Sequence, residues 1–231
     1  MAHKRRKKAK LVQQVLEFRD KDGRRHRSGR PRSKHSGIPH TRRVEFSAGD
    51  PLHVTLKICT GLPSMRKRRA FHAVLRAFAG GKLGAKGKAG FRLTQYAVLG
   101  NHIHLMVEAD SRKHLAKGMC GLKVRIARAL NKVWGRAGNV FQERYHDVVL
   151  DSPSRVRNAL NYILHNGRKH GIAGLERWYD PCSSARWFDG FRDAIPDTKW
   201  PPALARAQSW LLSKGWRRRG LLTLVPCPPA P

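Results

Sequence analysis

The stretch that decides the fold reads Gly100-Asn101-His102-Ile103-His104-Leu105-Met106-Val107. A Gly-Asn pair is typical of a tight turn, and the residues after it alternate in type as they do in a half-buried strand. Side chains two residues apart lie on the same face of a strand. The pattern therefore predicts Ile103, Leu105 and Val107 in a core, with both imidazoles together on the opposite face. Two neighbouring imidazoles can bind one divalent cation.

The segments on either side of this stretch predict the remaining elements. Alternation over 53–58 indicates a first strand, and apolar residues at helical spacing predict a helix that begins at Ser64 and ends at Gly80-Gly81. Further strands are expected over about 91–99 and 145–150, and helices over about 111–134 and 153–169. The order β-α-β-β-α-β-α predicts an α+β fold of antiparallel strands with helices packed on one face of the sheet.

The chain divides into three parts by composition. Residues 1–50 are predicted to form a basic flexible arm, residues 51–175 the main domain, and residues 176–231 an aromatic-rich C-terminal extension with a Pro-rich tail. The arm contains Gly29-Arg30-Pro31-Arg32, a segment that resembles hooks that lie in the minor groove of A·T-rich DNA. A solvated linker is the alternative interpretation of the same composition.

The charge points to a polyanionic partner. The sequence has 48 Lys and Arg against 15 Asp and Glu, a net charge of +33. Such an excess repels itself unless a polyanion neutralises it, and nucleic acid is the first candidate. Ribosomal and other structural RNA-binding proteins share this composition, so charge alone does not separate an enzyme from a binding protein.

The sequence also indicates a compartment. Cys59, Cys120, Cys182 and Cys227 form no CxxC pair, which argues against a zinc knuckle or a disulfide framework and favours reduced thiols. We find neither a signal peptide nor a run of the ~18 apolar residues that a membrane span needs. The expected location is cytoplasmic and nucleoid-associated.

A second group of polar residues lies on the predicted helix 153–169. Tyr162 and Asn166 are four residues apart and therefore share a face, with Arg155 and Lys169 on roughly the same side. A tyrosine among cations and an amide is unusual for packing, although tyrosines at the edge of a core are common.

Three motifs together resemble a known family. The segments Tyr96–Val107, Gly138–Asp147 and Asn161–Asn166 are similar, in this order and spacing, to the REP-associated tyrosine transposases of the HUH superfamily. The resemblance covers about residues 53–175, so the main domain is expected to be an HUH single-tyrosine transposase domain. Two residues depart from the family pattern: Phe141 stands where Trp is usual, and Gly167 where Pro is usual.

The resemblance implies a ferredoxin-like antiparallel four-stranded sheet and a Mg²⁺ or Mn²⁺ cofactor. It implies that His102 and His104 bind the metal with help from Asn166, and that Tyr162 is the catalytic nucleophile. The activity it implies is metal-dependent nicking and rejoining of single-stranded, hairpin-bearing DNA through a covalent phosphotyrosine. A cation on the phosphodiester would offset the charge that develops in the transition state.

Other interpretations stay open. Two alternatives to a transposase are a domesticated protein that recognises repeated palindromes without transposition and a basic RNA-binding structural protein. The sequence is compatible with a monomer and with a homodimer. Of the remaining histidines, His53, His72, His114, His146, His165 and His170 are expected to be spectators, with His165 a rival ligand because it precedes Asn166. The residues expected to contact DNA are Lys4, Arg5, Arg6, Lys7, Lys8, Arg30, Arg32, Lys123, Arg155 and Lys169.

Overall fold

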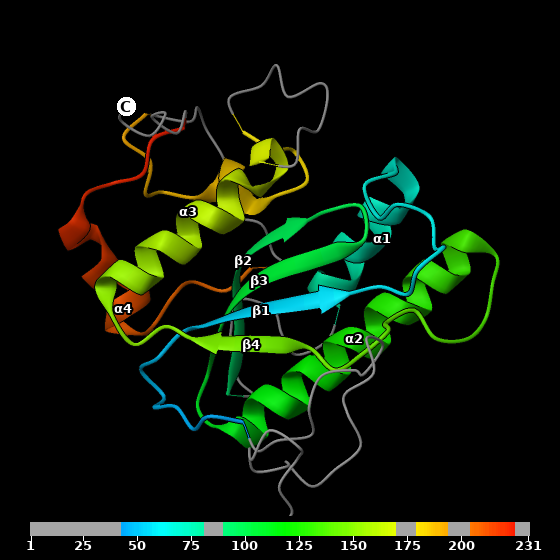
Figure 1. Cartoon of the computed structure of the whole chain (residues 1–231), viewed down its shortest axis with the longest axis horizontal. Helices are drawn as coiled ribbons and strands as arrows, with labels where there is room; N and C mark the ends of the chain where they lie inside the picture. Colours follow the sequence, from blue (N-terminus) through cyan, green and yellow to red (C-terminus); the bar gives the residue numbers. More distant parts are fainter. Residues whose placement is uncertain (1–42, 81–89, 170–178, 194–203, 225–231) are drawn as a thin grey trace, which may run out of the picture. The chain divides into compact units, whose positions relative to one another are not determined.

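The elements follow one another in the predicted order. The structure is a computed structural model that describes residues 43–80, 90–169, 179–193 and 204–224. Contacts divide the chain into Met1–Pro39 and His40–Pro231, and every described residue belongs to the second unit. Its elements are β1 (Leu52–Lys57), α1 (Arg68–Ala79), β2 (Phe91–Val98), β3 (His102–Ala109), α2 (Arg112–Trp134), β4 (His146–Val149) and α3 (Pro153–Lys169), followed by the short η1 (Ser184–Trp187), α4 (Trp210–Ser213) and η2 (Gly215–Arg219) (Figure 1).

The four strands form one sheet in the order β2-β3-β1-β4. Each strand is antiparallel to its neighbours. The two central strands, β1 and β3, are joined to the edge strands through helices or through the tight turn before His102. This arrangement confirms the predicted α+β fold with a ferredoxin-like antiparallel sheet.

Helices α1 and α2 pack on one face of this sheet. Ile103, Leu105 and Val107 of β3 are fully buried there, as their alternation predicts. Helix α2 contributes a stripe at helical spacing that includes Leu115 and Leu122. Burying an aliphatic side chain stabilises the fold by ~1.5–3 kcal/mol. A slip of one residue would move these side chains to the other face of the sheet, so their burial fixes the register of the strands.

Helix α3 covers part of the opposite face. Met106 of β3 forms a second core with Leu160 and Ile163 of α3 and with Trp216 of η2. Helix α3 contacts β2 and β3 (Figure 1). On the β1–β4 half of the same face, Lys57 and His146 are exposed. The sheet is therefore covered completely on one side and over about half of the other.

The C-terminal extension packs on the β2 edge of the sheet. The carboxylate of Glu108 is fully buried and accepts hydrogen bonds from the backbone N–H groups of Gln208 (3.0 Å) and Ser209 (2.8 Å) and from Nε of Arg92 (3.0 Å). The N–H of Ala205 donates to the carbonyl of Leu93 (2.8 Å), which continues the ladder beyond β2. These bonds hold the extension against the strands that precede it in sequence by about a hundred residues.

Two local features differ from the sequence-based expectation. Helix α1 begins at Arg68 with Lys67 as its N-cap, because Ser64 instead forms a turn in which its Oγ accepts from the N–H of Arg66 (3.2 Å). The last residues of the segment assigned to the arm contact the domain: Arg43 donates to Asp147 (2.5 Å). Within the described residues, none of the helices combines the length and apolar composition that crossing a bilayer requires.

Candidate active site

Strand β3 holds the two histidines side by side. Asn101 ends the turn, and β3 then places His102 and His104 on the face away from the α1–α2 core, with their ring centroids 4.8 Å apart. Oδ1 of Asn101 lies 2.7 Å from Nδ1 of His102. Because a carbonyl oxygen only accepts, this Nδ1 donates, and Nε2 is the nitrogen with the lone pair.

Helix α3 brings the tyrosine to this pair. The ring centroids of Tyr162 and His104 are 5.1 Å apart, with the rings nearly perpendicular. The helix is placed by the burial of Leu160 and Ile163, and it begins where the N–H of Arg155 donates to Oγ of Ser152 (3.4 Å). Segments some sixty residues apart thus converge, as the resemblance implies.

His53 of β1 is a member of this site that sequence reasoning set aside as a spectator. Its Nε2 lies 3.0 Å from Nδ1 of His104, and its ring centroid is 5.8 Å from that of Tyr162. Oγ1 of Thr55 also faces Nδ1 of His104, at 3.2 Å. The signal was present, since His53 and Thr55 alternate with buried residues. The missing information was that β1 pairs with β3, which no single-strand pattern reveals.

Burial changes the protonation of His53. Desolvation lowers its pKa from 6.5 to about 4, and repulsion from His146 acts in the same direction. His53 is therefore neutral near pH 7 and able to accept a hydrogen bond through a ring nitrogen. Nδ1 of His104 then faces two groups that can accept from it, which favours Nε2 as the nitrogen that would bind a cation.

Asn166 lies one turn beyond Tyr162 on the same side of α3. Its side chain is 1% exposed, and neither its Nδ2 nor its Oδ1 has a hydrogen-bond partner among the described residues. A buried amide without partners costs free energy, so such a group in a native fold calls for an explanation. A cation or a polar substrate group would supply the missing partner.

The donor set fits a divalent cation in chemistry. Imidazole nitrogen and amide oxygen are both ligands for first-row divalent ions, and an amide oxygen also suits Mg²⁺. Within the described residues, no three His, Cys, Asp or Glu side chains are arranged to hold a metal. The ligands that the resemblance implies are two histidines and one amide; the structure places the histidines together, and among the described contacts none joins Asn166 to them.

His165 does not act as a rival ligand in this structure. Its Nδ1 lies 2.9 Å from the carbonyl oxygen of Asn161, and its Nε2 lies 2.9 Å from that of Thr223. With an acceptor facing each ring nitrogen, the side chain links α3 to the C-terminal extension.

Gly167, where the family pattern has Pro, has a packing role. Helix α3 continues through it to Lys169, and a Cβ built on Gly167 would lie 2.1 Å from Oδ2 of Asp180. The carboxylate of Asp180 is held by both terminal nitrogens of Arg66, each at 2.8 Å. A side chain at position 167 would displace this buried ion pair, so glycine permits the close approach.

The residues expected to contact DNA are distributed unevenly. Arg155 is exposed on α3, two turns before Tyr162, and pairs with Asp151 (3.0 Å). Lys123 belongs to α2, on the other side of the sheet, where its Nζ donates to the carbonyl of Glu143 (2.8 Å). The structure thus does not bring Lys123 to the histidines. Lys169 is the last residue of α3, and Lys4, Arg5, Arg6, Lys7, Lys8, Arg30 and Arg32 lie outside the described residues.

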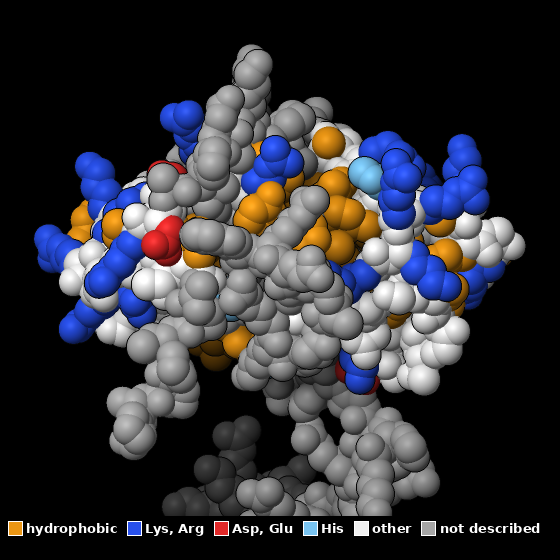
Figure 2. Space-filling view, turned by 90° about the horizontal axis from the view of Figure 1, so that it is seen from above, with side chains coloured by type: hydrophobic (Ala, Val, Ile, Leu, Met, Phe, Trp, Pro, Cys, Tyr) orange, Lys and Arg blue, Asp and Glu red, His pale blue; other side chains and the backbone are white. Residues whose placement is uncertain are grey.

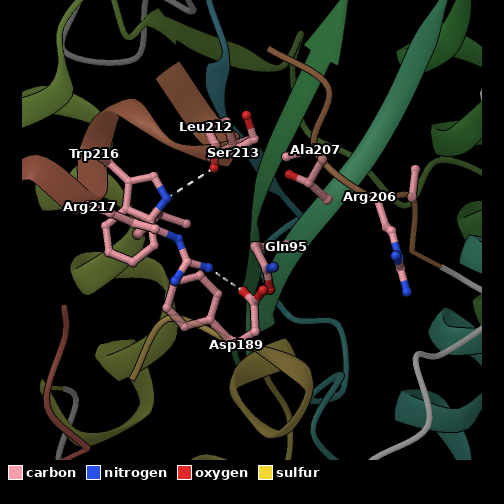
Figure 3. A pocket seen from close by; sticks show the side chains of 12 residues that line it. Gln95, Asp189, Arg206, Ala207, Leu212, Ser213, Trp216 and Arg217 are labelled. Atoms are coloured by element: carbon pink, nitrogen blue, oxygen red, sulfur yellow. Dashed lines mark hydrogen bonds and ion pairs between the residues drawn. The ribbon is translucent and has the colours of Figure 1, made fainter. Parts of the chain in front are cut away.

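A separate pocket of about 420 Å³ lies between β2, α3 and the C-terminal extension. Figure 3 shows Arg217 paired with Asp189 (2.9 Å) near Gln95, and the indole nitrogen of Trp216 donating to the carbonyl of Leu212 (3.0 Å). The lining residues include neither the histidines nor the tyrosine described above. This pocket is therefore distinct from the candidate active site.

Comparison with known proteins finds a partial structural similarity and no match in sequence. No family model and no curated protein matches the chain. A solved structure of a REP-associated tyrosine transposase bound to a REP hairpin aligns with 58% of this chain and 75% of that chain, at 18% sequence identity and a TM-score of 0.42. A likeness at this level carries no argument about family or activity, so the fold assignment rests on the strand order itself.

Proposed function

We propose that this protein is a metal-dependent single-tyrosine transposase that nicks and rejoins single-stranded, hairpin-bearing DNA. The observation that supports this function is the convergence of a histidine pair on β3 with a tyrosine on α3, which lies one turn before a buried amide that has no hydrogen-bond partner among the described residues. His102, His104 and Asn166 would hold Mg²⁺ or Mn²⁺, and the ion would offset negative charge on the phosphodiester.

In the proposed step the hydroxyl oxygen of Tyr162 attacks phosphorus. A P–O bond to the tyrosine forms, the P–O bond to the 3′ oxygen breaks, and the phenol proton leaves while the departing oxygen gains one as a 3′-OH. The phosphotyrosine keeps the energy of the original ester, so attack by another 3′-OH rejoins the strand without ATP. A phenol is a weak nucleophile, so it depends on the cation or on neighbouring basic groups for activation.

The test uses single-stranded oligonucleotides that carry a palindromic hairpin with randomised flanking nucleotides. With Mn²⁺ the wild-type protein should form a covalent protein–DNA adduct that survives denaturing gel electrophoresis, and with EDTA it should not. Tyr162→Phe should form no adduct and should keep hairpin binding, because the ring and its packing are retained. Tyr145→Phe is the matched control, since Tyr145 lies under Arg43 and not beside the histidines.

Two results would contradict the proposal. If Tyr162→Phe forms adducts at the wild-type rate, Tyr162 is not the nucleophile. If the wild-type protein binds hairpins tightly but forms no adduct in Mn²⁺, the chain is a DNA-binding protein that recognises palindromes without cutting them.

A further inference from the structure

Helices α1 and α2 carry charge of one sign only. Neither helix contains an Asp or Glu. Their basic residues are Arg68, Arg69 and Arg76 in α1, and Arg112, Lys113, Lys117, Lys123, Arg125, Arg128 and Lys132 in α2. A solvated helix usually mixes both signs at a spacing of four residues, which stabilises it. Helices α1 and α2, which cover the sheet face opposite the candidate active site, contain no such pairs of opposite charge.

The seam between these helices is hollowed. Two adjoining hollows of about 400 and 440 Å³ share Arg69, Arg76 and Val133 in their linings, so they form one groove. We call it the α1–α2 groove. Ala73 and Ala129 also line it, and their small side chains leave space between the flanking cations. Figure 2 shows Lys and Arg side chains at both ends of the face in view, one of them the end where α1 lies.

The cations of the groove are not neutralised by the described part of the chain. The side chains of Arg68, Arg69, Arg76 and Lys132 form neither an ion pair nor a hydrogen bond with any described residue. Elsewhere the fold supplies acceptors to its arginines, such as the carboxylate of Asp180 to Arg66 and the carbonyl of Ala77 to Arg125. Among the described residues nothing neutralises these cations, which is what a polyanion-binding surface requires.

The start of α1 also favours an anionic partner. Lys67, Arg68 and Arg69 place three positive charges at the positive end of the helix dipole, and the first turn contains no acid. This arrangement destabilises the protein alone. A bound polyanion would relieve the repulsion among these groups.

We infer that the α1–α2 groove binds the phosphate backbone of nucleic acid, as a second surface separate from the candidate active site. Arg69 and Arg76 are two turns apart, ~10 Å along the helix. That length matches a run of phosphates, which follow one another every ~3.4 Å along each strand of a duplex. Arginine also matches phosphate geometry with its planar fork of donors. Contacts of this kind are independent of base sequence.

The test compares two double variants that remove equal charge. Arg69→Gln/Arg76→Gln empties the groove of two cations, and Lys214→Gln/Arg219→Gln removes two exposed cations from the C-terminal extension. Binding to a labelled hairpin is measured by fluorescence anisotropy over a range of salt concentrations. EDTA is present and Tyr162→Phe is the background, so the result does not depend on metal or cleavage. Circular dichroism checks that both variants fold.

The groove variant should bind at least tenfold more weakly than the background protein. The slope of log K against log salt should fall in magnitude by about 1.8, which is ~0.9 for each lost phosphate contact. The control variant should change the slope by less than half as much. Equal slopes in the two double variants would overturn the inference.

Poly-glutamate as a competitor identifies the kind of polyanion. If the groove variant loses hairpin affinity but its weak affinity for poly-glutamate is unchanged, the partner is nucleic acid. If poly-glutamate binds the wild-type protein as tightly as the hairpin and loses as much affinity in the groove variant, the partner is an acidic protein and the inference fails.

Discussion

Acidification should destabilise this protein through His53, and the structure gives the size of the effect. Burial lowers the pKa of His53 to about 4, against 6.5 for an exposed histidine. Below pH 6.5 the unfolded chain therefore binds a proton at this position that the folded protein does not. The stabilisation is complete above pH 6.5 and is lost as the pH falls toward 4.

The magnitude follows from the two pKa values. Each unit of difference corresponds to about 1.4 kcal/mol, so full protonation would reduce the free energy of unfolding by about 3 kcal/mol. Between pH 7 and pH 5 the unfolded state becomes almost fully protonated while folded His53 stays mostly neutral. The expected loss over this interval is about 2 kcal/mol from this one side chain.

Urea unfolding at pH 7 and pH 5, with EDTA present, measures this loss. His53→Gln is the comparison, because glutamine does not titrate and can place an amide oxygen near the position of Nε2. The groups that face His53 are His104, His146 and Tyr162, and all remain in both proteins. The variant should lose about 2 kcal/mol less than the wild type between the two pH values. Equal losses would refute the reasoning.

Three further substitutions test other contacts. His53→Phe should weaken Mn²⁺ binding, measured by electron paramagnetic resonance, by about tenfold because His104 loses the closer of its two orienting partners and keeps Thr55, whereas His53→Gln should stay within about threefold of the wild type. Gly167→Ala should lower the free energy of unfolding in urea by ~1–3 kcal/mol, because the added carbon meets Asp180; a neutral result would show that α3 can shift. Glu108→Ala should cost ~3–5 kcal/mol in the same assay, since it removes the acceptor of two backbone N–H groups and the closer carboxylate of Arg92, which keeps its 3.4 Å contact with Asp110. Native-like stability would contradict the role assigned to this carboxylate.

The sequence predicts the elements well where one face is strongly apolar. The helix expected over about 111–134 is found at Arg112–Trp134, and that expected over 153–169 at Pro153–Lys169. In both helices, apolar residues recur at helical spacing, and residues that favour helix ends stand at the boundaries. The end of α2, for example, is set by Gly135 in the left-handed conformation (φ 61°). Local patterns suffice here because packing and propensity agree.

The start of α1 shows the limit of local signals. Ser64 is a good N-cap residue, yet the chain uses it in a turn that is tied to the β2–β3 connection: the N–H of Met65 donates to the carbonyl of Gly100 (2.9 Å). A contact between segments so distant in sequence cannot be read from the residues around Ser64. Tertiary hydrogen bonding therefore overrides the capping preference.

The candidate site was predictable in part. The pairing of His102 with His104 follows from strand alternation alone. The approach of Tyr162 needs α3 to cross the correct face of the sheet, which the family resemblance implies but the periodicity of α3 does not. His53 joins through strand order, which is a property of the whole sheet. The packing of the C-terminal extension depends on Glu108, which accepts from the backbone N–H groups of Gln208 and Ser209, and backbone donors carry no sequence signature.

The half-covered sheet has a consequence for how a ligand reaches the tyrosine. Helix α3 and the extension cover β2 and β3 on this face, so under the proposed function a DNA strand would approach over β1 and β4. The first side chains on that route are Lys57, His146 and Val148, all exposed. On the proposed function, a strand that enters from this side would meet the ammonium of Lys57 and the imidazole of His146 before it meets Tyr162.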